Sequence, residues 1–446
     1  MDSVTPHRCK VAIIGAGLAG LATAVAIGQS GHEVTVFEKS SELKEIGAGI
    51  NVPSNATRLF NKWGILSNLE ESSIKPIYAV MRSHQCHELS RTQLFPKFND
   101  TYESPYLVTH RADLQRILAT EATRLGSKLH FDAKITKIIF NRNAIKFANG
   151  STEEFDVIFG ADGEKSFCRE QLLEREDPLE DSGFEIFRTT VKRGDVVQNP
   201  KLGNLVTVPS INLWIGPDAH AVSYPIKGGD LLNVVLTKAH GNEAPLHILP
   251  VPVEKAAIRT AFSGWGTDFH DLLAITTQWN KRTMMYAKEC NTWIHPRNRF
   301  ALIGDAAHSS PPYLAQGAAM AFEDAAVLGV FFARLTSKDQ ICDLVAIYDE
   351  IRKPRAMECR SRSRDLRHVF TYADGPEQAE RDRRLMYEEP FEGSPNFLSD
   401  PVLQTWLFGY DAVRAGEEAW ENFLGGGETA LPQDWSSTTK LSGPST

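Results

Sequence analysis

The sequence predicts an α/β fold in which an N-terminal βαβ unit precedes an antiparallel β-sheet and a helical C-terminal region. Three observations predict it. The segment KVAIIGAGLAGLATAVAIGQSGHEVTVFEK (10–39) has the pattern of a strand, a glycine-rich turn, a helix and a second strand. Four alternating apolar runs follow between residues 184 and 237. Beyond residue 316, apolar residues recur at helical spacing.

Length and composition favour a large globular enzyme. The chain has 446 residues, 42% hydrophobic and 23% charged, enough for more than one domain-sized unit. The net charge of −8 and the lack of a Lys/Arg run argue against a nucleic-acid partner. Six scattered cysteines without a C-x-x-C pair favour a reducing compartment. No apolar run approaches the roughly 18 residues of a membrane span, so we expect a cytoplasmic protein.

No metal site is expected. The stretch SHQCHE, with His84, Cys86 and His87, contains metal-ligating residue types. Zinc ligands normally come as two separated pairs, however, and this single cluster lacks the second pair. A solvated loop is the better interpretation.

The remaining elements follow from periodicity. A helix is expected over 111–125, strands between 128 and 160, and four more strands at 184–192, 211–216, 220–226 and 231–237. Residues 244–284 are expected to be helical, and residues 300–303 to form a buried strand. Long helices are expected at 316–336 and 343–369, the second kinked at Pro354. The Gly-, Ser-, Thr- and Pro-rich end from 424 to 446 is expected to be disordered.

The GAGLAG turn has the spacing of a dinucleotide-binding site. Gly15 would make the tight turn, Gly17 would let the backbone approach a pyrophosphate, and Gly20 would let helix and strand pack closely. The start of the following helix attracts phosphate charge. Glu38, at the end of the second strand, would accept hydrogen bonds from a ribose, and a chance glycine-rich turn does not explain it.

Two later segments narrow the choice of dinucleotide. DVIFGADGEKSFCR (156–169) and FALIGDAAH (300–308) each end a strand in a Gly/Asp pair. With GAGLAG they give a triple pattern that resembles the single-component FAD-dependent aromatic hydroxylases, the group of salicylate and para-hydroxybenzoate hydroxylases. The resemblance covers roughly residues 9–415. It implies a Rossmann-like FAD-binding domain of the para-hydroxybenzoate hydroxylase fold. NADH or NADPH would bind transiently, since no second G-x-G-x-x-G follows a later strand.

The resemblance also implies roles for single residues in FAD binding. Gly15, Gly17, Gly20, Glu38 and the adjacent Lys39 would hold the ADP part, and Gly47 and Gly49 of the GAGI loop would run along the flavin. Arg111 would lie beside the pyrophosphate, Asp162 in a segment used for FAD and the nicotinamide donor, and Asp305 at the ribitol. Alone, Arg111 would read as a surface charge at a helix start and Asp162 as a turn former.

The closer likeness is to salicylate hydroxylases, fungal ones especially, through EIGAGINVPSNATRLFNKWG, GPDAHAVSYPIKGGDLLNVV, YADGPEQAERD and TWLFGYDA. It implies oxygen transfer to an aromatic ring from a flavin C4a-hydroperoxide in a dry, preorganised site. Pro311 and Pro312 would form a rigid wall of that site. After Gln316 and Gly317, a helix would direct its positive end at the reduced flavin ring.

The substrate is expected against the antiparallel sheet. His220, Val222, Tyr224 and Ile226 share one face of a strand by alternation. His220 and Tyr224 match a His and a Tyr that orient the ring and help remove the phenolic proton in the family. Arg188 or Lys227 would bind a carboxylate or phenolate. The alternatives remain an exposed His220, a Tyr224 that is plain core, and surface charges at the two cations. His308 is expected to be structural.

The leading interpretation is an FAD- and NAD(P)H-dependent monooxygenase, with O2 and a small phenolic or heteroaromatic compound as substrates, decarboxylative if the substrate is salicylate-like. An epoxidase or dearomatising hydroxylase of a polyketide or alkaloid is the alternative, and a non-catalytic flavin protein a third. The chain is expected to be a monomer or homodimer. The expected domains are an FAD-binding domain in two parts (1–184 and 286–370), a substrate-binding sheet (185–285), a helical C-terminal region (371–423) and the tail (424–446).

Overall fold

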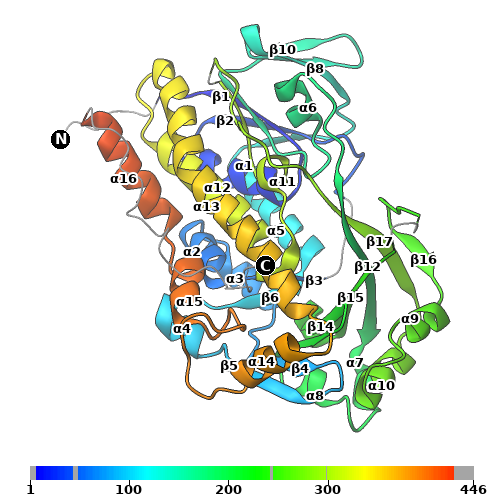
Figure 1. Ribbon diagram of the computed structural model, residues 1–446. Helices are drawn as coiled ribbons and strands as arrows, with labels where there is room; N and C mark the ends of the chain where they lie inside the picture. The colour runs from blue at the N-terminus through cyan, green and yellow to red at the C-terminus, as the bar shows by residue number, and fades with distance from the viewer. Residues whose placement is uncertain (1–6, 44–48, 242–244, 298, 426–446) are drawn as a thin grey trace.

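The computed structural model describes residues 7–43, 49–241, 245–297 and 299–425, which form two main sheets with helices around them (Figure 1). The first is a five-stranded sheet in the order β18-β11-β1-β2-β7, with every neighbouring pair parallel. The expected βαβ unit and the buried strand after residue 299 are confirmed in it. Its strands are β1 (Lys10–Ile14), β2 (Glu33–Phe37), β7 (Lys128–His130), β11 (Val157–Gly160) and β18 (Phe300–Leu302).

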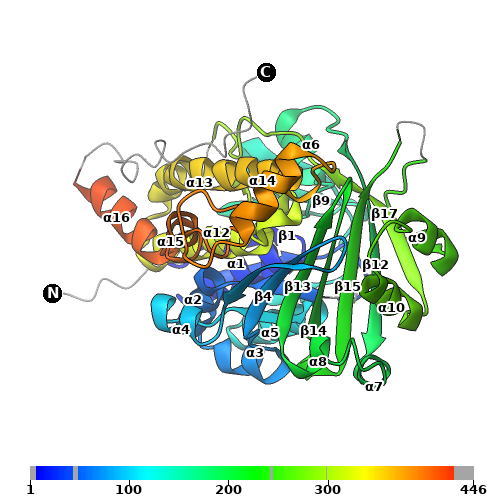
Figure 2. The same cartoon turned by 60° about the horizontal axis from the view of Figure 1, so that its bottom comes forward.

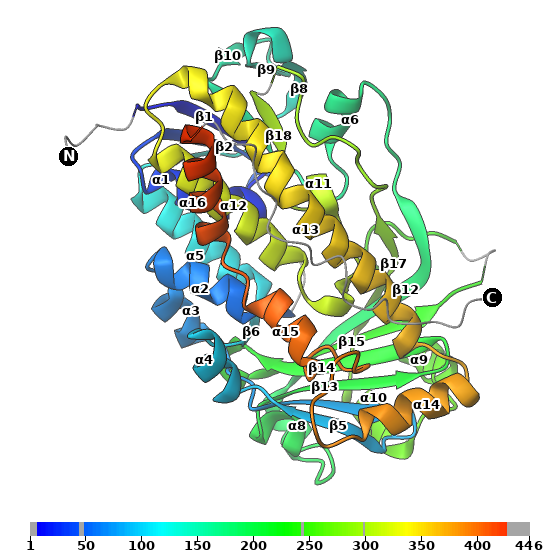
Figure 3. The same ribbon diagram turned by 60° about the vertical axis from the view of Figure 1, so that its left-hand side comes forward.

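Helices cover one face of this parallel sheet (Figure 3), and rings from the segment 140–155 pack on it as well, Phe147 and Phe155 against Phe37 and Phe140 against Phe300. Helix α12 packs on α1, α13 and α16, and α1 also packs on α5. The helices expected at 111–125, 316–336 and 343–369 are confirmed with small shifts at their ends. The bounds are α1 (Leu18–Gly28), α5 (Arg111–Arg124), α12 (Gly317–Ala333), α13 (Ile341–Phe370, with Pro354 inside it) and α16 (Ala412–Leu424).

The second sheet has eight strands in the order β16-β17-β12-β15-β14-β13-β4-β5 (Figure 2). The four strands expected between 184 and 237 are confirmed as β12, β15, β14 and β13. Two strands from the N-terminal part, β4 and β5, extend the sheet, with β4 parallel to β13. The bounds are β4 (Tyr78–Ser83), β5 (Glu88–Gln93), β12 (Glu180–Lys192), β13 (Ser210–Gly216), β14 (Ala219–Ile226), β15 (Leu231–Ala239), β16 (Val251–Val253) and β17 (Trp279–Tyr286).

The expectation that 244–284 is helical is wrong for part of the segment. Helices α9 (Lys255–Ala261) and α10 (Thr267–Ile275) are present, but β16 precedes them and β17 follows them. Strand β17 pairs with β12 over a long register that includes Arg188 opposite Asn280. This pairing partner lies about ninety positions away in the chain, so the sheet overrides the local pattern.

The eight-stranded sheet separates two environments. One face packs on α9, α10, α7 (Arg193–Val197) and α8 (Asn204–Thr207) through its own apolar cluster, which includes Phe187, Trp214, Leu232, Val234, Leu236 and Phe269. The opposite face is turned toward the parallel sheet. Because successive side chains of a strand point to opposite faces, each strand contributes one set of side chains to this apolar cluster. The other set lies on the opposite face and is available for a site.

Smaller elements complete the structure. They are β3 (Gly49–Val52) paired with β6 (Leu107–His110), the three-stranded sheet β8 (Ile135–Ile139), β9 (Ala144–Phe147) and β10 (Thr152–Glu154), and the helices α2 (Ser54–Lys62), α3 (Leu66–Ser72), α4 (Lys97–Tyr102), α6 (Phe167–Leu173), α11 (Asp305–His308), α14 (Pro376–Leu385) and α15 (Pro401–Phe408). Most of the tail expected to be disordered lies outside the described residues. Across the described ranges, no helix combines the length and apolarity needed to cross a membrane.

A buried charge network joins α12 to α13. Arg352 Nε lies 2.9 Å from Asp324 Oδ1, and Arg352 Nη1 lies 2.8 Å from Glu323 Oε2. Arg355 Nε lies 2.7 Å from the same Glu323 oxygen. Burial alone would raise the pKa of Asp324, but His308 and Arg352 outweigh it and hold that pKa at about 2. The carboxylates therefore stay charged inside the protein and depend on their partners.

Replacing Arg352 by Leu should lower the free energy of unfolding by roughly 3–5 kcal/mol, because two buried carboxylates would lose a partner. Urea unfolding of the purified, cofactor-loaded protein measures the change. Arg334 is a matched control, since its ion pair with Glu417 is about 40% exposed; Arg334→Leu should cost at most about 1 kcal/mol. Equal losses for the two variants would contradict a structural role for the network.

Candidate active site

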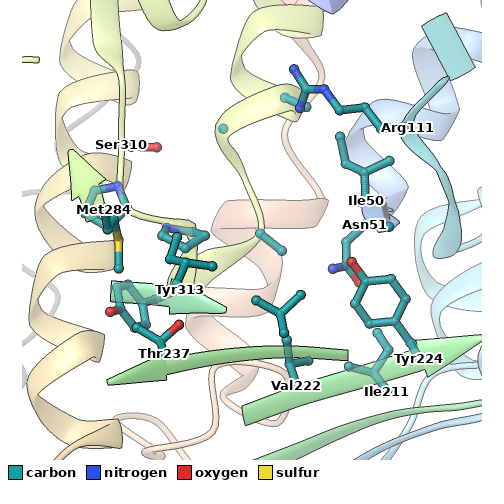
Figure 4. A pocket seen from close by; sticks show the side chains of 18 of the residues that line it. Ile50, Asn51, Arg111, Ile211, Val222, Tyr224, Thr237, Met284, Ser310 and Tyr313 are labelled. Carbon is teal, nitrogen blue, oxygen red and sulfur yellow. The ribbon is translucent and has the colours of Figure 1, made fainter. Parts of the chain in front are cut away.

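A cavity of about 400 Å³ lies between the eight-stranded sheet and the glycine-rich turns of the parallel sheet (Figure 4). Figure 4 shows Ile211, Val222 and Tyr224 on the sheet side and Arg111 and Ile50 across the cavity from them. The cavity thus brings together segments from the first, middle and last thirds of the chain.

The floor of the cavity is one face of the eight-stranded sheet. Side chains directly opposite one another on neighbouring strands share a face, so the registers define rows across the sheet. One row runs Met81, Leu213, Val222, Val235 and Arg188. The next runs Ile215, His220, Thr237, Ile186 and Arg282. All of these except Ile215 line the cavity. The expected face of His220, Val222 and Tyr224 is therefore the floor.

The GAGLAG turn has the shape of a phosphate cradle. Gly15 has φ +110°, and a Cβ there would lie 2.4 Å from the carbonyl oxygen of Ala161. A Cβ at Gly20 would lie 2.0 Å from the carbonyl oxygen of Gly15, so both positions require glycine. Gly17 lines the cavity, and a Cβ there would have no neighbour within 4 Å among the described residues. Gly15 and Gly20 shape the turn, and Gly17 leaves the open space.

The start of α1 completes this cradle. The helix has no side-chain hydrogen bond at its N-cap and no acidic residue in its first turn. Its unpaired N–H groups and positive end favour an anion such as a pyrophosphate. Arg111, the first residue of α5, also lines the cavity. This geometry fits the FAD that the sequence implies, with Gly17 and Arg111 toward the pyrophosphate.

Glu38 and Lys39 lie beside this cradle. Glu38 Oε2 accepts a hydrogen bond from the backbone N–H of Ala16 at 3.0 Å, and Oε1 accepts from Ser40 N at 2.9 Å. The carboxylate therefore ties the end of β2 to the glycine-rich turn. Lys39 is exposed, and neither residue is among the described residues that line the cavity. Their contact with the ADP part stays a prediction.

The Gly304–Asp305 turn is held by the charge network. Gly304 has φ +60°, and Asp324 Oδ2 accepts a hydrogen bond from its N–H at 3.0 Å. The same Asp324 oxygen lies 2.7 Å from His308 Nε2, so the side chain of His308 helps to hold the turn. Asp305 lines the cavity, and its contact with the ribitol of FAD stays a prediction.

Asp162 and Gln316 use their side chains for internal contacts. Asp162 Oδ1 accepts from Ser166 Oγ at 2.5 Å, and Oδ2 accepts from Cys168 N at 3.0 Å, which is the bonding of a turn former. Gln316 is 1% exposed, and its Oε1 accepts from Asn55 Nδ2 at 3.0 Å. The neighbours of each residue line the cavity, Gly163 beside Asp162 and Gly317 beside Gln316. Gln316 Nε2 has no hydrogen-bond partner among the described residues, and the cofactor contacts of Asp162 and Gln316 stay predictions.

The Pro311–Pro312 loop forms the wall next to the start of α12. Both prolines line the cavity, and Ser363 Oγ donates a 2.7 Å hydrogen bond to the carbonyl of Pro311. Helix α12 begins without a side-chain cap or an acidic residue in its first turn. Its positive end therefore faces the cavity without a compensating charge from its own first turn.

Gly47 falls outside the described residues, but Gly49 lines the cavity. A Cβ at Gly49 would lie 2.4 Å from Cε2 and 2.7 Å from the hydroxyl oxygen of Tyr224. Asn233 lies opposite Tyr224 in the sheet, and its Oδ1 accepts from Gly49 N at 3.2 Å. Strand β3 is thus fastened to the sheet at the position of Tyr224. Burial raises the pKa of Tyr224, with Arg188 opposing it, so the phenol is neutral.

His220 is buried, contrary to the alternative of an exposed residue after the GPD turn. Its ring centroid lies 5.0 Å from that of Tyr313 and 6.0 Å from that of Phe370. Burial lowers the pKa of His220 to about 3. The ring is therefore a neutral imidazole, and its Nδ1 is a buried nitrogen without a hydrogen-bond partner among the described residues.

Arg188 places a positive charge inside the cavity. Burial lowers its pKa to about 10, helped by Arg282, yet the group stays protonated at neutral pH. Arg282 pairs with Glu164 at 3.2 Å. For Arg188, no ion pair forms with a carboxylate of the described ranges, and its Nε lacks a hydrogen-bond partner there. Lys227 is not among the residues that line the cavity, and its Nζ lies 2.9 Å from Asp113 Oδ1, which favours the alternative of a surface charge.

Sequence reasoning missed several lining residues. Tyr313 follows the two prolines directly, and its buried hydroxyl has no partner among the described residues; its position after the rigid loop was a usable signal. Asn51 follows Gly49 by two positions on β3 and could have been found by alternation. Thr237 and Met284 carried no local signal of this kind.

Comparison with known proteins agrees with this geometry. The family model described as FAD binding domain matches residues 8–363. The chain is 32% identical to the FAD-dependent monooxygenase OpS4 of Beauveria bassiana over 92% of this chain and 97% of the relative. It is also 32% identical to 3-amino-4-hydroxybenzoate 2-monooxygenase PtnB3 of Streptomyces platensis, over 93% of this chain and 100% of that protein.

A solved structure supports the fold. A salicylate hydroxylase substrate complex superposes with a TM-score of 0.76 at 24% identity, covering 94% of this chain and 98% of that one. The predicted arrangement of an FAD-binding fold with an antiparallel sheet is therefore confirmed.

The neutral His220 predicts a pH effect on stability. Because its folded-state pKa of about 3 lies below the usual 6.5, the unfolded chain binds the proton first as the pH falls. The contribution of the neutral His220 ring to the free energy of unfolding is therefore complete above about pH 6.5, and it declines as the pH falls toward 3. His220→Phe should reduce the loss of unfolding free energy between pH 7 and pH 5 by about 2 kcal/mol. Urea titrations at both pH values measure it. Exposed His87 is the control; a matching change in His87→Phe would contradict the assignment.

Gly49→Ala should raise KM for the aromatic substrate, since the added methyl group would displace the ring of Tyr224. Steady-state kinetics measure KM, and flavin absorbance gives the FAD content so that rates are compared per bound flavin. Gly194→Ala is the control, because a Cβ there meets no described atom within 4 Å. Kinetics of Gly49→Ala equal to those of Gly194→Ala would show that Tyr224 does not contact the substrate.

Proposed function

The chain belongs to the FAD-binding-domain family of FAD-dependent monooxygenases, and from that premise we propose that it hydroxylates a small anionic aromatic compound, a phenolate or an aromatic carboxylate, with NADH or NADPH as electron donor. The overall reaction consumes the aromatic compound, O2, NAD(P)H and a proton, and yields the hydroxylated product, water and NAD(P)⁺. When bound, FAD supplies the activation of oxygen and its transfer to the ring.

The observation that carries this proposal is the unmatched charge of Arg188. A buried cation without a counter-ion is costly, whereas a bound anion that pairs with it gains a charge-assisted hydrogen bond. The floor beside Arg188 is apolar. Val235 lies directly opposite Arg188, and Val222 and Leu213 follow it in the same row. A planar ring carrying one negative group matches an apolar floor on which Arg282 is paired with Glu164 and Arg188 is the cation left for a ligand.

Arg188, Tyr224 and His220 would prepare the ring for attack by an electrophilic oxygen. A nearby guanidinium favours the ionised form of a substrate phenol, and a phenolate is a stronger nucleophile than a phenol. Burial raises the pKa of Tyr224 and Arg188 lowers it, so the charge of the guanidinium acts at the Tyr224 hydroxyl. His220, a neutral imidazole in the cavity lining, would orient the substrate ring by packing against it.

The opposite wall would exclude water. Pro311 and Pro312 have no backbone N–H to donate, and Tyr313 closes against His220 and Phe370. A wall fixed in this way protects the reaction from solvent while leaving the positive end of α12 toward the cofactor. Pro312 is thus a wall residue in this proposal, and Gly317 the point at which the helix charge acts.

The test of the function is substrate-stimulated NAD(P)H oxidation by the FAD-loaded protein across salicylates, hydroxynicotinates and larger phenols, with product mass. A gain of one oxygen atom supports hydroxylation, and a simultaneous loss of the carboxyl group supports the decarboxylative form. A protein that holds FAD but shows no stimulated NAD(P)H or O2 consumption with any of these compounds would refute the proposal.

Arg188→Gln should raise KM for an aromatic carboxylate about tenfold to a hundredfold, the usual effect of losing a hydrogen bond to a charged group. The amide of the same acid should be affected much less, because it carries no charge. Lys227→Gln is the control, since Lys227 pairs with Asp113 away from the cavity. Equal KM changes for the acid and its amide would show that Arg188 does not bind the anionic group.

A further inference from the structure

Few charged side chains line the cavity. Within the described ranges they are Arg111, Glu164, Arg188, Arg282 and Asp305. Arg111 and Asp305 are predicted to contact FAD, at the pyrophosphate and at the ribitol. Because burial keeps the ring of His220 neutral, the charge that a substrate meets depends on the other three side chains, Glu164, Arg188 and Arg282.

Arg188 and Arg282 are neighbours on the floor of the cavity. Arg282 on β17 lies opposite Ile186 on β12, and Arg188 follows Ile186 by two positions on the same strand. Residues two apart on a strand share a face, so both arginines belong to the face that lines the cavity. Diagonal neighbours of this kind on adjacent strands have their Cα atoms about 7–8 Å apart. The two strands lie side by side in Figure 1, and one bound molecule can therefore contact both guanidinium groups.

Glu164 reaches Arg282 from the parallel sheet. It lies in the connection between β11 and α6, directly after Gly163. Its Oε1 lies 3.2 Å from Arg282 Nη1, and the side chains of Arg282 and Glu164 are 29% and 28% exposed. Burial raises the pKa of Glu164 and Arg282 opposes this rise, so the charge of the carboxylate depends on its partner. The ion pair adds no net charge to the cavity.

The three side chains together carry one positive charge. Arg188 has no carboxylate partner in the described part of the chain, whereas Arg282 has Glu164. An aromatic acid bound to Arg188 matches that one charge. A second carboxylate on the ring would approach Arg282 only in competition with Glu164, and these two like charges would repel each other. The repulsion is strong where a ligand excludes water, because the local dielectric constant is low.

We propose that Glu164 is a specificity-determining residue, which neutralises Arg282 and thereby makes the site select aromatic acids with one carboxylate over ring dicarboxylates. The inference rests on the proposed function, in which Arg188 binds the anionic group of the substrate. Arg188 attracts one carboxylate, and Glu164 excludes a second one from the neighbouring cation. The pair is thus a device that sets the number of negative charges a substrate carries.

The experiment compares Glu164→Gln with the wild-type, FAD-loaded enzyme on meta-hydroxybenzoate and on hydroxyisophthalate, which is the same ring with a second carboxylate. Glutamine keeps the size of the side chain but removes its charge, so Arg282 becomes available to the second carboxylate. The ratio of Kd for hydroxybenzoate to Kd for hydroxyisophthalate should rise about tenfold or more, the usual gain from a hydrogen bond to a charged group. The perturbation of flavin absorbance gives both Kd values without turnover.

A double variant separates the effect of charge from a disturbance of the local structure. Combining Glu164→Gln with Arg282→Gln removes both charges of the pair, so the ratio should fall back toward the wild-type value. Glu185→Gln is the matched control. Glu185 pairs with Lys281 at 2.7 Å on the same two strands, but neither residue lines the cavity. This variant should leave the ratio unchanged.

Four results would overturn the proposal. They are a wild-type enzyme that binds the dicarboxylate as tightly as the monocarboxylate, an unchanged ratio in Glu164→Gln, a ratio in the double variant as high as in Glu164→Gln, and an equal rise in Glu185→Gln. Each is distinct from failure of the proposed function. That failure would appear as a wild-type enzyme whose flavin absorbance and NAD(P)H oxidation respond to no aromatic acid.

Discussion

The pairing of two buried carboxylates with two buried arginines is the constraint on which the site depends. Glu323 and Asp324 stand side by side on α12, and Arg352 and Arg355 approach them from α13. A buried ion pair is rarely a source of net stability, but it tolerates only one geometry because each charge needs its partner. The network therefore fixes how α12 lies against α13.

The same network also fixes the position of backbone segments on the cofactor side of the cavity. Asp324 holds the N–H of Gly304, which sets the turn that carries Asp305. Glu323 accepts from Asn55 Nδ2 at 2.8 Å, and Asn55 also bonds Gln316 at the start of α12. The start of α12 and the turn that carries Asp305 are thus positioned by one set of charges. The cavity needs this rigidity because a helix dipole acts only over its first turn.

A feature could be predicted from the sequence when the residues that produce it are close together in the chain. Local patterns predicted the strands from β12 to β15, the glycine-rich turn and the position of Asp305 in the cavity lining. Each of these is a motif or an alternation that is visible in the sequence itself. The attachment of β4 and β5 to the sheet, and the strand β17, depend on pairing between distant segments. Lys227 had the right residue type but is engaged by Asp113, a partner no spacing rule reveals. Phe397, which also lines the cavity, lies far along the chain from the rest of the site.

The resulting cavity separates two tasks by secondary structure. Turns and helix starts, made of glycine and proline with few side chains, present backbone N–H groups and open space to the cofactor. The sheet presents side chains in rows, and a row can change one residue at a time without moving the backbone. Cofactor binding is thereby tied to the fold, while the side chains of the floor can vary independently. Asn396, Phe397 and Leu398 add lining residues from a segment between α14 and α15, outside the glycine-rich turns. Differences in substrate choice between proteins of this fold are therefore expected to come from the side chains of the sheet and of this segment.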